Sequence, residues 1–131
     1  MQSIEVKTHS RNELIDITSE VRKAVRSTGV TDGILVLYVP HTTAGLVIDE
    51  AFDPSVAEDI SRTLSRLIPA GAGYSHLEGN ADSHIKSSIV GISHTLIIEN
   101  GEIILGRWQG IFFAEFDGPR TRKVYLKVIK E

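Results

Sequence analysis

The chain has 131 residues, 17 of them acidic and 14 basic, a formal net charge of −3 and no cysteine. A chain of this length fits one domain, and the lack of cysteine excludes disulfides, thiolate metal ligands and iron–sulfur clusters. Because the sequence has no basic run, no signal-like start and no apolar stretch of about 18 residues, we expect a soluble cytoplasmic protein with no nucleic-acid and no membrane partner.

Apolar patterning predicts the elements of the first half. Residues 2–8 alternate apolar and charged side chains, which predicts a half-buried strand. A short helix is expected to start at Thr18, as its cap, and to end at Gly29. The apolar run over 33–39 predicts a central strand covered on both faces, and a second apolar strand is expected over 46–48.

Two helices are predicted in the middle of the chain. The clearer one covers 54–67, where Asp53 is the cap and proline takes the first helical position. The glycine-rich stretch 70–80 has the length of a functional surface loop. After it, Asn80 or Asp82 is expected to cap a short helix.

Strands return in the last third. Those over 95–98 and 102–105 flank Asn100-Gly101, a pair that favours a tight hairpin turn. Further strands are predicted over 108–116 and 123–130, the last with apolar residues on both faces. This grouping predicts an α+β fold in a single domain over residues 1–131, with antiparallel or mixed sheets, a sandwich-like core and two to three helices. The two-faced strands also suggest an oligomer.

Three histidines sit at predicted element ends, and they are the strongest candidates for chemistry. His41, His76 and His84 could hold a metal ion and leave a fourth coordination position open. A nearby carboxylate, Glu50 or Asp82, could take a proton or orient a ligand. Helix capping explains Asp82 equally well, and Glu50 can be a solvated strand end.

A second group of residues could bind a substrate. Arg120 and Arg122 project to the same side of a strand start, and their guanidinium groups could hold phosphate or carboxylate. Lys86 could add to such an anion site. Trp108 and Gln109 could stack on and orient a heteroaromatic ring, although core packing is the simpler role for Trp108. A surface salt-bridge ladder is the simpler role for the arginines.

These segments, taken in order, resemble the YjbQ family, also called UPF0047, over the whole chain. The resemblance lies in the ranges 39–45, 49–54, 76–86, 106–113 and 115–122. It implies a compact α+β subunit in a homotrimer, a metal cluster at His41, His76 and His84, and a weak thiamine phosphate synthase activity. That activity joins a pyrimidine diphosphate to a thiazole phosphate. Thr42 and Asn80 lie in these segments as further substrate-binding candidates.

The sequence therefore leaves three functional readings open. The first is a metal-dependent enzyme acting on a phosphorylated small molecule, with zinc as the expected cofactor, or magnesium for a diphosphate. The second is a zinc-dependent hydrolase with Glu50 or Asp82 as the base. The third is a trimer that binds a metal or an anion without turning it over.

Overall fold

The computed structural model describes residues 1–131 as eight strands and three helices. In chain order these are β1 Gln2–Lys7, β2 Glu13–Asp16, α1 Thr18–Ser27, β3 Gly33–Tyr38, β4 Ala44–Glu50, α2 Pro54–Leu67, α3 Ala81–Val90, β5 Ser93–Glu99, β6 Glu102–Ile103, β7 Gln109–Glu115 and β8 Thr121–Lys130. None of the helices has the length and apolar character that crossing a membrane requires.

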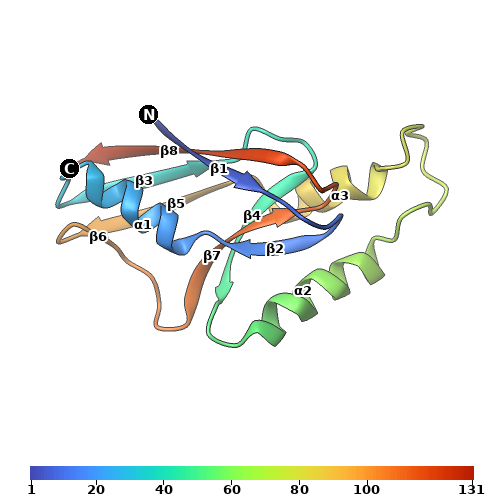
Figure 1. Ribbon diagram of the computed structural model, residues 1–131, viewed down its shortest axis with the longest axis horizontal. Coiled ribbons are helices and arrows are strands. Elements are labelled where there is room, and N and C mark those ends of the chain that lie inside the picture. Colours follow the sequence, from blue (N-terminus) through green and yellow to red (C-terminus); the bar gives the residue numbers. More distant parts are fainter.

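Two antiparallel sheets share one core. The larger sheet has the strand order β1-β8-β3-β5-β6 and the smaller has the order β2-β7-β4 (Figure 1). Leu35 and Leu37 of β3, Leu46 of β4 and Phe113 of β7 belong to the same cluster of buried apolar side chains. The predicted single α+β domain is therefore confirmed, and every pair of neighbouring strands is antiparallel.

The larger sheet is covered on one face only, which corrects the expectation that the strand over 33–39 is covered on both faces. In β3, Leu35 and Leu37 are fully buried, whereas Ile34 and Tyr38 are 37% and 44% exposed. In β8, Ile129 is also exposed and pairs with Ile34 across the strands. The second sheet and α1 contribute side chains to the core on one face, and no element of the chain covers the other. The apolar sequence of β3 therefore does not indicate that other parts of the chain cover both faces of the strand.

Most of the predicted helix ends and turns are confirmed. Asp53 accepts a hydrogen bond from the Ser55 N–H at 2.9 Å and caps α2 as predicted. Asn100 and Gly101 have φ values of 53° and 80°, which confirms the tight β5–β6 turn. The cap prediction for Thr18 is wrong, because the residue at the N-cap position of α1 is Ile17.

Two features of the sheets differ from the predictions. The four residues of β2 were left out of the predicted strands, although they pair with β7. Trp108 precedes β7, lies in a turn and is 47% exposed, so the expected core role is wrong for this side chain. The indole is half exposed because Trp108 lies at the edge of the smaller sheet, outside the core that the two sheets share.

The end of α3 is fixed tightly against β4. Ser87 donates a hydrogen bond from its hydroxyl to the carbonyl oxygen of Ala44 at 2.7 Å. A Cβ atom at Gly45 would lie 2.6 Å from the carbonyl oxygen of Gly91, so only glycine allows this approach. The contact sets α3 beside the loop that joins β3 to β4 (Figure 1).

Candidate functional site

Three loops that are distant in the sequence enclose one polar cavity, called the polar pocket here. Its volume is about 350 Å³, and none of its ten lining residues is hydrophobic. The lining residues are Pro40, His41, Thr42, Thr43, Glu78, Asn80, His84, Asp117, Arg120 and Arg122. Six predicted site residues therefore meet in it: His41, Thr42, Asn80, His84, Arg120 and Arg122.

His41 is held in place from one ring nitrogen. Its Nε2 atom accepts a hydrogen bond from the backbone N–H of Lys123, at 2.9 Å. Burial lowers the pKa of this imidazole below its ordinary value, and the nearby charge of Arg122 lowers it further. The ring is therefore neutral at pH 7, with its proton on Nδ1.

The His76 and His84 rings pack edge to face, and of the two only His84 lines the polar pocket. Their ring centroids are 5.2 Å apart and their planes are nearly perpendicular. His84 lies in the first turn of α3, and His76 lies in the preceding loop, where its Nε2 atom is 3.8 Å from a carboxylate oxygen of Glu78. The loop and the helix start thus bring two imidazoles and one carboxylate together.

This arrangement fits a bound metal in part. Two imidazoles that share a tetrahedral zinc, with Zn–N near 2.0 Å, have ring centroids roughly 5 Å apart, as His76 and His84 do. His41 does not complete the set as it stands, because its Nε2 lone pair is taken by Lys123. No group of three or more histidine, aspartate or glutamate side chains is placed to hold a metal ion.

Arg122 enters the pocket from a buried ion pair. Its Nε atom donates to a carboxylate oxygen of Glu115 at 2.8 Å, and its Nη2 atom donates to Glu115 and to the Thr43 hydroxyl. Both charged side chains are almost completely buried. Burial alone would raise the pKa of Glu115, but hydrogen bonds from Arg122, from the Asp117 N–H and from the Thr8 hydroxyl hold it below its ordinary value. The guanidinium is therefore held rigidly in place.

Arg120, Asp117 and Asn80 form a second hydrogen-bonded group. Asp117 accepts on one oxygen, Oδ2, from Arg120 Nη2 and from Asn80 Nδ2, each at 2.9 Å. The amide orientation of Asn80 is thereby fixed. Its Oδ1 atom is buried and receives no hydrogen bond. The pocket thus has fixed donors in its arginines and an acceptor without a donor at Asn80.

Asp82 and Lys86 lie outside the polar pocket, in a buried network behind it. Arg11 binds both carboxylate oxygens of Asp82, at 2.9 and 3.0 Å. The Nζ atom of Lys86 donates to Asn12 and Ser65, both at 3.0 Å, and lies 3.8 Å from Asp82. These contacts tie α3 to the β1–β2 loop and to α2. They show a positioning role, and the substrate and base roles predicted for these two residues stay predictions.

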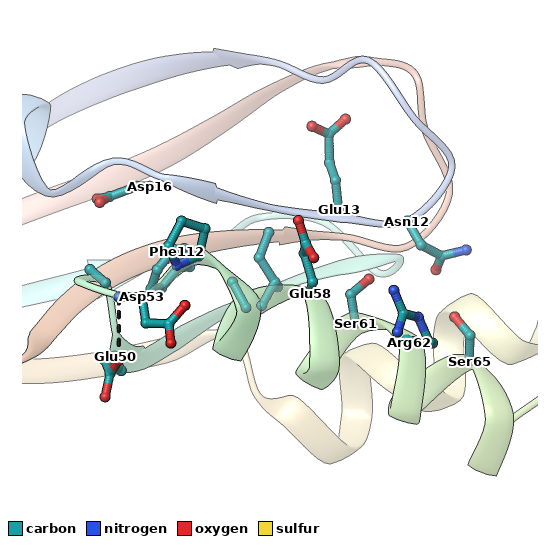
Figure 2. Close-up of a pocket in the computed structure, with 14 residues that line it drawn as sticks. Asn12, Glu13, Asp16, Glu50, Asp53, Glu58, Ser61, Arg62, Ser65 and Phe112 are labelled. Carbon is teal, nitrogen blue, oxygen red and sulfur yellow. Dashed lines mark hydrogen bonds between the residues drawn. The ribbon is translucent and has the colours of Figure 1, made fainter.

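Glu50 lines a second, larger cavity of about 700 Å³ between α2 and the smaller sheet (Figure 2). Its other carboxylates are Glu13, Asp16, Asp53 and Glu58.

Trp108 and Gln109 line neither cavity. The Trp108 ring packs on Phe52 with centroids 5.1 Å apart, and Gln109 accepts a hydrogen bond from the Gly106 N–H. The predicted aromatic platform is therefore separate from the histidines and arginines within one subunit.

The prediction missed several residues that shape the pocket. Glu78 and Asp117 line it, and Glu115 and Arg11 position its walls. Glu78 and Asp117 each lie within three residues of a predicted site residue, and this closeness in the sequence is the signal that identifies them as candidates. Nothing in the sequence pairs Glu115 with Arg122, because that pairing depends on how the β7–β8 connection folds back.

The comparisons with known proteins agree with one another over the whole chain. The family model described as "UPF0047 protein YjbQ-like" matches residues 2–131. UPF0047 protein MJ1081 of Methanocaldococcus jannaschii is 58% identical over 125 residues, which cover 95% of this chain and 91% of the relative. UPF0047 protein YugU of Bacillus subtilis is 48% identical over 130 residues, or 98% of each chain.

Solved structures show the same fold. A YjbQ/UPF0047 family protein from Clostridium acetobutylicum has a TM-score of 0.96 at 50% identity, covering 98% of this chain and all of its own. The protein APE1520 of Aeropyrum pernix has a TM-score of 0.95 at 38% identity, covering 99% of this chain and 98% of its own.

Proposed function

This chain belongs to the YjbQ-like UPF0047 family, and on that premise we propose that it is a metal-dependent enzyme acting on a phosphorylated small molecule. One observation carries the proposal. Imidazoles and arginines from the β3–β4 loop, the start of α3 and the start of β8 line a single cavity without any hydrophobic residue. Such a cavity suits a strongly polar anion better than an apolar ligand.

His76 and His84 would hold the metal, and His41 would join them once its ring rotates. Zinc is the expected ion because imidazole is a preferred zinc ligand, with magnesium possible for a diphosphate substrate. When bound, the metal would supply a positive charge that polarises a phosphoryl oxygen. Arg120 and Arg122 would orient the phosphoryl group, and Thr42 would add a hydroxyl at the pocket wall.

Two reactions follow from this assignment. Glu78 lies beside His76, which favours a hydrolase in which this carboxylate takes a proton from water. Thiamine phosphate formation, which the family resemblance implies, is a second reaction to assay. It has less support, because Trp108 lies outside the pocket and no phenylalanine, tyrosine or tryptophan side chain lines it.

Elemental analysis of purified protein tests the metal assignment. After zinc is supplied and excess removed, we expect about one zinc per subunit in wild type and a large loss in His84→Ala. His9→Ala is the matched control, because His9 is exposed and lies outside the polar pocket.

Zinc well below one per subunit in wild type, or full zinc in His84→Ala, would contradict the ligand assignment. Zinc uptake without turnover of any phosphorylated compound would support a non-catalytic binder instead.

We also propose that the subunit forms a homotrimer, as the resemblance implies. Two separate surfaces favour this. The outer face of the larger sheet exposes Ile34, Ile97 and Ile129, and α2 has no fully buried residue despite an apolar stripe that includes Ile60 and Leu64. A ring of subunits uses two different patches per subunit, so these two surfaces are suitable partners for each other.

A further inference from the structure

The polar pocket has an unusual wall for a small-molecule site. Ligand pockets are lined mostly by hydrophobic and aromatic side chains, whereas no hydrophobic residue lines this one. Its volume of about 350 Å³ is at the lower end of the usual range. A flat heteroaromatic ring would find no hydrophobic side chain to pack against inside it, and only the imidazole rings of His41 and His84.

One side of the pocket offers unused donors. Arg122 donates hydrogen bonds from Nε and Nη2 to Glu115 and Thr43, and its Nη1 atom has no hydrogen-bond partner in the chain. Arg120 donates hydrogen bonds from Nε and Nη2 to Asp117, and its Nη1 atom likewise has no partner in the chain. Because Arg122 is almost wholly buried and held from behind by Glu115, it presents its free nitrogen without losing further side-chain freedom. Two guanidinium groups at one cavity suit a phosphoryl group.

The other side offers acceptors that have no donor. The Asn80 amide holds Asp117 in place through the bond from its Nδ2 atom, whereas its own Oδ1 atom is closed off from solvent and so from a ligand. Asp117 Oδ1 accepts nothing within the chain, and the Glu78 carboxylate lies at the rim. Carboxylates repel phosphoryl oxygens but accept hydrogen bonds from hydroxyl groups. A ligand that satisfies this side therefore brings several hydroxyl donors.

We propose that the polar pocket binds a phosphorylated polyol, such as a sugar monophosphate, with Arg120 and Arg122 on the phosphoryl group and Glu78 and Asp117 on the hydroxyls. This inference rests on the proposed function and narrows its substrate class. Inorganic phosphate carries no polyol hydroxyls for Glu78 and Asp117, so these acceptors give selectivity for the phosphorylated polyol.

Calorimetric titration of the full chain, with and without zinc, tests this inference with three probes. The probes are ribose 5-phosphate, inorganic phosphate and thiamine monophosphate. We expect ribose 5-phosphate to bind at least about tenfold more tightly than either of the others, because only it satisfies both walls.

Two variants test the contributions of the two sides of the pocket separately. Arg120→Gln is expected to weaken binding of all phosphates, with the exposed Arg107→Gln as its control. Glu78→Gln is expected to reduce the preference for ribose 5-phosphate over inorganic phosphate, with Glu99→Gln as its control. Both altered side chains are exposed, so the variants keep the fold.

The outcomes distinguish this inference from the proposed function. Equal affinity for ribose 5-phosphate and thiamine monophosphate would overturn the polyol preference and leave a phosphate-binding enzyme in place. No binding of any probe, with or without zinc, would overturn both. Ribose 5-phosphate binding that is unchanged in both variants would place the ligand elsewhere and overturn the inference.

Discussion

At the scale of single residues, the buried pair of Glu115 and Arg122 links stability to the site. Glu115 accepts hydrogen bonds from Arg122, from Thr8 and from two backbone N–H groups, so its carboxylate is fully satisfied. The same contacts aim Arg122 into the polar pocket. A buried charge pair of this kind contributes less to net stability than its contacts suggest, but losing one partner is costly.

Glu115→Gln is therefore expected to lower the free energy of unfolding by about 3–5 kcal/mol at pH 7, since it leaves the Arg122 charge buried without a partner. The deficit has a defined pH dependence. The folded state holds the pKa of Glu115 below its unfolded value of about 4.3, so its contribution is present above that pH and is lost as the pH falls through the folded pKa. Urea unfolding between about pH 7 and pH 3 measures both effects.

Glu102→Gln is the matched control, because Glu102 pairs with Arg26 on the exposed surface. This variant is expected to leave the urea midpoint nearly unchanged. Two results would contradict this account of the Glu115–Arg122 pair. One is a Glu115→Gln protein that is as stable as wild type at pH 7. The other is a stability difference from wild type that does not become smaller at acid pH.

At the scale of elements, the position of the pocket depends on how α3 meets β4. Gly45 lets the β4 backbone approach the end of α3, where Gly91 has a φ of 93° and ends the helix. The backbone N–H of Leu46 donates to the Gly91 carbonyl at 3.1 Å. Since His84 is on α3 and His41 is on the loop before β4, this contact fixes their separation.

Gly45→Ala is expected to destabilise the protein by about 1–3 kcal/mol, because the added Cβ would lie 2.6 Å from the Gly91 carbonyl oxygen. Thermal unfolding followed by circular dichroism measures this change. Ser88→Ala, on the exposed face of α3, serves as the control and is expected to stay within about 0.5 kcal/mol of wild type. Equal stability of the two variants would mean that β4 can move away from α3 without cost.

At the scale of the whole molecule, the proposed homotrimer is supported by the apolar surface that the chain leaves exposed. Ile34, Ile97 and Ile129 are cross-strand neighbours on the outer face of the larger sheet. Ile97 is 62% exposed, and both neighbours are more than a third exposed. A contiguous apolar patch on a sheet face is typical of an interface between subunits.

Ile97→Lys is expected to convert a trimer into monomers while leaving the subunit folded, because an exposed position tolerates lysine but a buried interface does not. Sedimentation velocity at micromolar concentration measures the change. Glu99→Lys places the same side chain two residues further along the same strand and is expected to remain trimeric. A monomeric wild type would contradict the trimer, and a trimeric Ile97→Lys would move the interface away from this face.

The local signals of the sequence determined most of the elements. Asp53 and the following proline marked the start of α2, Asn100-Gly101 marked the β5–β6 turn, and alternation marked β1. These signals work because caps, turns and amphipathic faces depend on residues only a few positions apart. The four residues of β2 carry no comparable signal, because so short a strand is recognised only by its pairing with β7.

The tertiary structure alone decided which candidates share a site. The sequence pointed to His41, His84 and the two arginines, and the folded chain placed them in one pocket. The fold also places Trp108 outside this pocket, against Phe52, and pairs Asp82 with Arg11. The physical reason is that residue type reveals what a side chain can do, whereas its neighbours are set by strand register and packing between segments distant in the chain.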